Sequence, residues 1–108
     1  MMRRKTRYIL VESATPIAEG GRARFEPLLY RSMLQSIGDL DYHRSNPKIA
    51  KFLDERRFIL RCSLEGYRKA LLALAMIKRI DERETAFYTL KSSGTIRALG
   101  RSAVSGRA

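Results

Sequence analysis

The sequence predicts an α+β fold, an α/β sandwich in which helices cover one face of an antiparallel sheet. Residues 57–63 alternate apolar and polar side chains with the period of a β-strand. Residues 65–80 carry apolar side chains at helical spacing, and a second strand-like run follows at residues 85–92. A strand, a helix and a further strand in direct succession predict two packed layers.

The strand at residues 57–63 has one apolar face and one face that carries arginine. Its apolar face is formed by Phe58, Leu60 and Cys62. Its other face holds Arg57, Ile59, Arg61 and Ser63. Because helices are expected to cover the apolar face, the two arginines are left for a contact outside the chain.

The start of the chain predicts an inner strand and a helix. Residues 8–12 are apolar on both faces, as expected for a strand that is covered on each side. Residues 13–21 contain proline and two glycines and predict a loop. The first helix is expected to begin at Glu26-Pro27 and to stop at Gly38, because proline suits a first turn and glycine a helix end.

The middle of the chain predicts an edge strand. Residues 39–47 are polar and are expected to be irregular. Residues 49–53 alternate weakly and are expected to form a hairpin with the strand at residues 57–63. Lys48 and Lys51 are charges of the kind that an exposed edge strand carries.

The second helix, at residues 65–80, carries two apolar side chains outside its buried stripe. Leu72 and Met76 lie on the opposite, charged face. They indicate either a contact beyond the core or scattered surface side chains, and the sequence leaves both readings open. A last strand at residues 85–90 and a short helix from Thr95 to about Leu99 complete the expected elements.

The expected order is β-α-β-β-α-β, the ferredoxin-like or RRM-like arrangement, with an additional short C-terminal helix. Residues 7–100 form the single domain of this reading. Residues 1–6 are expected to be a basic N-terminal arm, and residues 101–108 a flexible basic tail. Two helices on one sheet face leave the other face for the tail or for a partner.

The charge balance makes nucleic acid the leading partner. Lysine and arginine total 22 against 11 acids, which gives a net charge of +11. Such an excess repels itself in a compact chain, and a polyanion relieves that repulsion. Arginine also forks onto phosphate and stacks on bases. The alternative is a basic solvated surface without a ligand.

The sequence offers little support for a catalytic site, a metal site or a membrane-spanning segment. One cysteine and one histidine cannot form a Cys/His zinc site, and no nucleophile motif or paired carboxylates accompany them. We therefore expect no catalytic residue, no bound metal and no cofactor in this chain. The basic start lacks an apolar stretch long enough for a signal peptide, and no run could span a bilayer, so a cytoplasmic protein is expected.

Phosphate contact is the expected mode of nucleic-acid binding. Base stacking is disfavoured, because residues 57–61 contain no glycine and one aromatic, unlike the strand with which related folds stack bases. The candidate residues come from the arm, the strand and the start of the tail: Arg3, Arg4, Lys5, Arg57, Arg61, Arg97 and Arg101. If about six of them met phosphates, log K would fall with log salt at a slope of roughly −4 to −5.

The turn at residues 92–97 offers a second candidate contact. Gly94 permits close backbone approach, and the hydroxyls of Ser93 and Thr95 precede a predicted helix start. The free amides of that start could hold an anion, with Arg97 one turn further on. The spacing equally fits a simple helix cap formed by Ser93 or Thr95.

The sequence resembles the archaeal ribonuclease P protein component 2 family. The resemblance rests on Phe58-Ile59-Leu60-Arg61-Cys62, followed by a helix and a strand that ends in Ser93-Gly94-Thr95-Ile96-Arg97. Arg7-Tyr8-Ile9 and Asn46-Pro47 also fit, so that the resemblance covers about residues 5–100.

The resemblance implies a protein subunit of ribonuclease P, which removes the 5′ leader from precursor tRNA. The RNA of that complex would hold magnesium ions and perform the cleavage, while this chain would be non-catalytic and would touch precursor tRNA only indirectly. The implied partners are the ribonuclease P RNA, protein component 3 and, through self-association, a second copy of the chain. Arg61 and the turn at residues 93–97 become candidates for RNA or subunit contact, and Leu72 and Met76 for the protein interface.

Two other classes remain open. A structural RNA-binding protein of another ribonucleoprotein, such as the ribosome, would carry the same charge and topology. A small enzyme of ferredoxin-like fold is the third possibility, and loss of a purified activity in His43→Ala would favour it.

Overall fold

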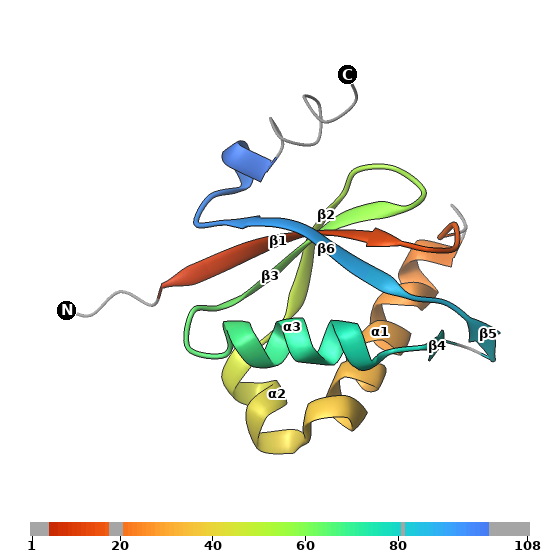
Figure 1. The fold of residues 1–108 in the computed structure, drawn as a ribbon, viewed down its shortest axis with the longest axis horizontal. Coiled ribbons are helices and arrows are strands. Elements are labelled where there is room, and N and C mark those ends of the chain that lie inside the picture. The colour runs from red at the N-terminus through yellow and green to blue at the C-terminus, as the bar shows by residue number, and fades with distance from the viewer. Residues whose placement is uncertain (1–4, 18–20, 81, 100–108) are drawn as a thin grey trace.

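The computed structural model describes residues 5–17, 21–80 and 82–99. Three numbered helices and six strands lie within these residues, and a short helical turn at residues 96–99 follows them (Figure 1). The elements are β1 (Thr6–Ser13), α1 (Arg22–Ile37), α2 (Asp39–Ser45), β2 (Lys48–Phe52), β3 (Arg57–Ser63), α3 (Tyr67–Met76), β4 (Arg79–Ile80), β5 (Arg83–Glu84) and β6 (Phe87–Ser93).

The main sheet has the strand order β2-β3-β1-β6, and every neighbouring pair is antiparallel. The central strands are β1 and β3, as the apolar character of residues 8–12 and the alternation of residues 57–63 predicted. The edges are β2 and β6. This order confirms the predicted α+β, ferredoxin-like arrangement.

The helices cover one face of this sheet and form the main core with it (Figure 1). Phe58 and Leu60 of β3 are fully buried there, as predicted from their alternation. Phe58 contacts three other aromatic rings, with ring centroids 5.7 Å from Phe25, 6.2 Å from Phe52 and 6.1 Å from Phe87. These contacts anchor β3 against α1 and against the edge strand β6.

The opposite face of the sheet is only partly cationic, which corrects the expectation for residues 57–63. Ile59 is completely buried there, together with Leu10 of β1 and Leu99. Leu99 belongs to a short helical turn at residues 96–99, which lies across the sheet from α1 and α3 (Figure 1). We call this face the open face, and its apolar centre is closed by the C-terminal turn that the sequence predicted.

The first helix begins earlier than predicted, at Arg22, and Pro27 lies inside it. Proline at this position removes the hydrogen bond to the carbonyl of Ala23, which is in the exposed first turn, so the missing bond falls where water can replace it. Residues 39–45 are also helical, where an irregular segment was expected. Two acids in the first turn of α2 and two basic side chains in its last turn suit the helix dipole.

The second helix is shorter than predicted. It ends at Met76, and Ile77 is extended although its side chain stays buried. The chain then forms a small hairpin from β4 and β5, whose connection contains Glu82 in the left-handed region with φ 65°. Helical spacing of apolar residues up to Ile80 therefore did not distinguish the helix from the hairpin that follows it, and the last strand begins at Phe87.

Candidate nucleic-acid interface

A row of polar side chains crosses the open face of the sheet. Lys48 of β2 lies opposite Arg61 of β3, Arg61 lies opposite Tyr8 of β1, and Tyr8 lies opposite Ser93 of β6. Directly opposite residues of antiparallel strands project to the same side, about 5 Å apart at Cβ. The four side chains therefore form one continuous line, which we call the cross-strand row.

The cations on and beside this row are available to a ligand. Arg61, Lys48, Lys51, Lys5 and Arg97 are all exposed. None of these five forms an ion pair with any residue in the described part of the chain. Unpaired cations that project from a sheet and its flanking turn suit phosphate, because they need not break an internal ion pair to bind it.

Arg57 shares the strand face of Arg61 but is held by a neighbour. Its Nε lies 2.9 Å and its Nη2 2.8 Å from Oδ2 of Asp54, while its backbone N–H donates to Oδ1 at 2.8 Å. Burial opposes the charged form of Asp54, but hydrogen bonds from Arg56 and Arg57 outweigh it and lower the pKa of this carboxyl. Arg57 thus closes the turn between β2 and β3, and its contact with RNA stays a prediction.

The turn at residues 93–97 forms a helix cap. The Oγ of Ser93 accepts a hydrogen bond from the N–H of Thr95 at 3.3 Å, and Oγ1 of Thr95 accepts one from Ala98 at 3.4 Å. Gly94 is exposed, and a Cβ added there would meet no atom within 4 Å. The capping alternative therefore describes the local structure, and anion binding by Ser93, Gly94 and Thr95 stays a prediction.

A groove lies beside the cross-strand row at the start of β1. Its lining includes Lys5 and Tyr8 of the N-terminal side, Arg61 of β3, and Arg44 and Asn46 at the end of α2. Asn46 has the left-handed backbone, with φ 46°, that lets the chain turn from α2 into β2. The groove thus collects three cations and an aromatic ring from three separate segments.

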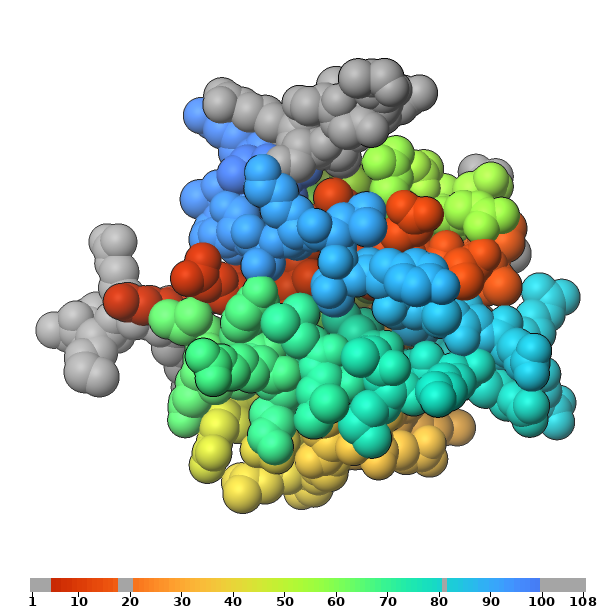
Figure 2. Space-filling model, viewed as in Figure 1, coloured from red at the N-terminus to blue at the C-terminus, as the bar shows by residue number. Residues whose placement is uncertain are grey.

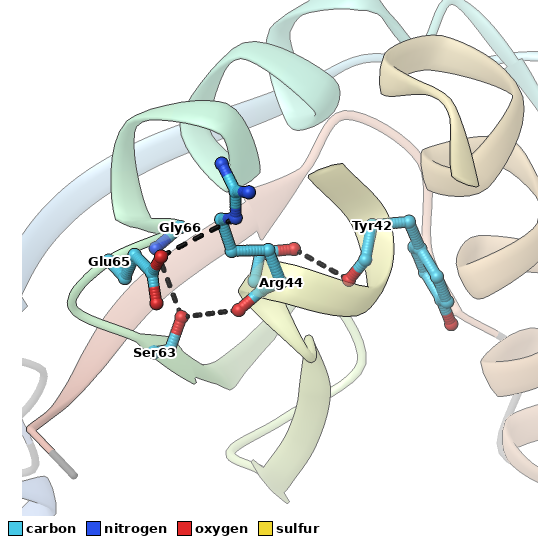
Figure 3. Close-up of polar contacts among 6 residues, drawn as sticks. Tyr42, Arg44, Ser63, Glu65 and Gly66 are labelled. Carbon is cyan, nitrogen blue, oxygen red and sulfur yellow. Dashed lines mark hydrogen bonds and ion pairs between the residues drawn. The ribbon is translucent and has the colours of Figure 1, made fainter. Parts of the chain in front are cut away.

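The wall of this groove is held by a junction between α2 and the loop before α3 (Figure 3). The hydroxyl of Ser63 donates to the carbonyl of Arg44 at 2.8 Å and accepts the N–H of Gly66 at 3.0 Å. Nε of Arg44 lies 3.4 Å from Oε1 of Glu65. These three contacts fix the end of α2 beside the end of β3, at one wall of the groove.

A separate apolar surface lies on the helix layer. Leu72 and Met76 are 47% and 49% exposed on α3, as their position outside the apolar stripe predicted. Tyr88 and Leu90 of the edge strand β6 are exposed to a similar degree. Figure 2 shows α3, in green, directly below β6, in blue, on one face of the molecule. Tyr88, however, lies opposite Glu12 and therefore projects to the open face, so the apolar surface of the helix layer is formed by Leu72 and Met76.

Cys62 and His43, which could support catalysis by the protein, are each constrained by their surroundings. Cys62 is 1% exposed, and burial raises the pKa of its thiol to about 11 although Arg7 acts in the opposite direction. His43 belongs to α2, not to a loop as expected, and its Nδ1 lies 2.9 Å from the carbonyl of Asp39. In the described residues no three metal-ligating side chains gather, and no helix there is long and apolar enough to cross a membrane.

Of the predicted contacts, Lys5, Arg61 and Arg97 lie around the open face and its groove. Arg3, Arg4 and Arg101 lie outside the described residues, as do most of the predicted arm and tail. Sequence reasoning missed Tyr8, Arg44 and the place of Lys48 in the row. The register of β1, β2 and β3 joins these residues, and no spacing within one segment shows it.

One comparison with known proteins identifies a family for the chain. The sequence model of the Rpp14/Pop5 family matches residues 7–104, almost the whole chain. A search of curated proteins found no match.

Proposed function

Because the chain belongs to the Rpp14/Pop5 family of ribonuclease P protein subunits, we propose that it binds and stabilises the catalytic RNA of that complex. The observation that carries the proposal is the set of cations on the open face that form no ion pair with any described residue, next to a groove at the end of the cross-strand row. A basic protein lowers the repulsion between phosphates and favours the folded RNA.

The proposal also includes the more specific assignment to component 2, which is taken from the sequence resemblance. The chain would act as component 2 of an archaeal ribonuclease P in the cytoplasm and would contact precursor tRNA only indirectly. The RNA would hold magnesium and cut the 5′ leader, while this chain supplies no catalytic residue. A ribosomal role, the alternative open from sequence, receives no support from the family match.

The cross-strand row gives the sharpest test of RNA contact. We expect Lys48→Gln with Arg61→Gln to weaken binding to the ribonuclease P RNA about tenfold and to reduce the salt slope by about 1.5, since each lost phosphate contact removes about 0.7–0.9. Fluorescence anisotropy at several salt concentrations measures both quantities.

The matched control is Arg31→Gln with Arg68→Gln. These arginines are exposed on α1 and α3, in the helix layer, and their removal changes the net charge by the same amount. We expect this control to leave most of the affinity and the slope in place. Equal losses in the two double variants would mean that net charge, and not the open face, attracts the RNA.

The second part of the proposal places the protein partner on the helix layer. Leu72 and Met76 are candidates for the contact with protein component 3, and the same surface is the candidate for self-association. Fully covered apolar side chains at the centre of an interface carry much of its binding energy.

We expect Leu72→Asp with Met76→Asp to weaken association with purified component 3 about tenfold or more. Leu40→Asp serves as the control, because Leu40 is 69% exposed and belongs to a different helix, α2. Isothermal titration measures the association, and sedimentation velocity reports self-association of the same samples. Unchanged binding in the double variant would show that the interface lies elsewhere.

A further inference from the structure

The groove at the end of the cross-strand row combines charge with an aromatic ring. Tyr8 lines it and is only half-buried, packing on the cluster of Leu10, Ile59 and Leu99. The Tyr8 hydroxyl forms no hydrogen bond with any residue that the structure describes. Apolar packing therefore holds the ring, and the side chain also lines the groove.

The cations of the groove are placed around this ring. Arg61 lies directly opposite Tyr8 in the β1–β3 register, and Lys5 precedes β1. Glu65, the acid among the described lining residues, is engaged by Arg44. Asn46 adds an exposed side-chain amide, which can both donate and accept a hydrogen bond.

This combination differs from a plain phosphate-binding surface. Phosphates of a duplex need cations at the rim but leave an aromatic ring without a role. An unpaired nucleotide presents a base to stack and a phosphate to bind, and proteins of many kinds meet it with an aromatic ring flanked by basic side chains. The groove offers both within neighbouring residues of two paired strands.

We propose that this groove binds one unpaired nucleotide of the RNA, with the base stacked on Tyr8 and the phosphate held by Arg61 and Lys5. The inference rests on the proposed function, because it assumes that the open face meets RNA. It modifies the sequence-based expectation of phosphate contact alone, since the stacking ring comes from β1 and not from β3.

The test compares two labelled probes on the full chain, an eight-nucleotide single-stranded oligoadenylate and a blunt twelve-base-pair RNA duplex. We expect Tyr8→Leu to weaken single-strand binding about tenfold, within the range of one lost stacking contact, and to leave duplex binding unchanged. Leucine keeps apolar packing on Leu10 and removes the ring, so the fold is preserved. Tyr8→Phe is the matched control and should bind like the parent protein.

A competition experiment separates the base from the phosphate. Adenosine monophosphate should displace the single-stranded probe at about tenfold lower concentration than ribose 5-phosphate, which lacks the base. Equal competition, or equal binding of Tyr8→Leu and the parent protein to the single strand, would overturn the inference. If the parent protein bound ribonuclease P RNA with a steep salt slope in that case, the proposed function would stand and only the nucleotide site would fail.

Discussion

Phe58→Ala is expected to lower the free energy of unfolding by about 3–5 kcal/mol, the cost of deleting a large aromatic side chain from a packed core. Phe58 is fully buried, and its ring contacts Phe25 of α1, Phe52 of β2 and Phe87 of β6 at centroid distances of 5.7, 6.2 and 6.1 Å. Its removal leaves a cavity that joins both layers. Urea denaturation, followed by circular dichroism, measures the loss.

The control for this experiment is Tyr88→Ala. Tyr88 lies on β6, one residue from Phe87, but is 55% exposed, so its removal should change stability by only about 0.5 kcal/mol. An unfolding slope that is the same in both variants would confirm that stability, and not the denatured state, has changed. Equal losses in the two variants would show that burial of β3 does not anchor the sheet.

The elements that the sequence predicted best are those whose pattern repeats within one segment. Alternation in residues 57–63 gave a strand with Phe58 and Leu60 inside, and the apolar run at residues 8–12 gave an inner strand. Such patterns report directly on which face is buried. They do not report what covers the other face, and the burial of Ile59 by Leu99 had to come from the structure.

The elements that the sequence missed depend on contacts between segments. The helix α2 is short and packs against α1 and α3, and its polar residues gave little apolar period. The hairpin of β4 and β5 has two residues in each strand, too few for any period to be visible. Local propensity is a weak guide wherever tertiary packing decides.

In the candidate site, too, the sequence predicted what lies within one segment but missed what depends on contacts between segments. Composition predicted a basic surface, and the alternation of β3 placed Arg61 on the open face. The strand register then brought Lys48 and Tyr8 to Arg61 from segments 13 and 53 residues away in sequence. Arg57, by contrast, is neutralised by Asp54, an i,i+3 neighbour that the sequence already contained. The ion pair could therefore have been anticipated, whereas the row could not.

Gly66→Ala is expected to destabilise the protein by roughly 1–3 kcal/mol through steric overlap. A Cβ at this position would lie 2.3 Å from the Cα of Ser45, far inside contact distance, and the obstructing atom is backbone that cannot rotate away. The φ of −99° is open to alanine, so the cost is not one of backbone conformation. The end of α2 must therefore move away from α3.

Gly94→Ala is the matched control, because a Cβ there meets no atom within 4 Å and the smaller entropy of the unfolded chain slightly favours the folded state. Thermal denaturation should separate the two variants by several degrees.

Displacement at Gly66 would also strain the hydrogen bond from Ser63 to Arg44, which holds the groove wall (Figure 3). Gly66→Ala should therefore weaken binding of the single-stranded probe even where the chain remains folded. Unchanged stability and unchanged binding would show that α2 and α3 are not locked at this junction.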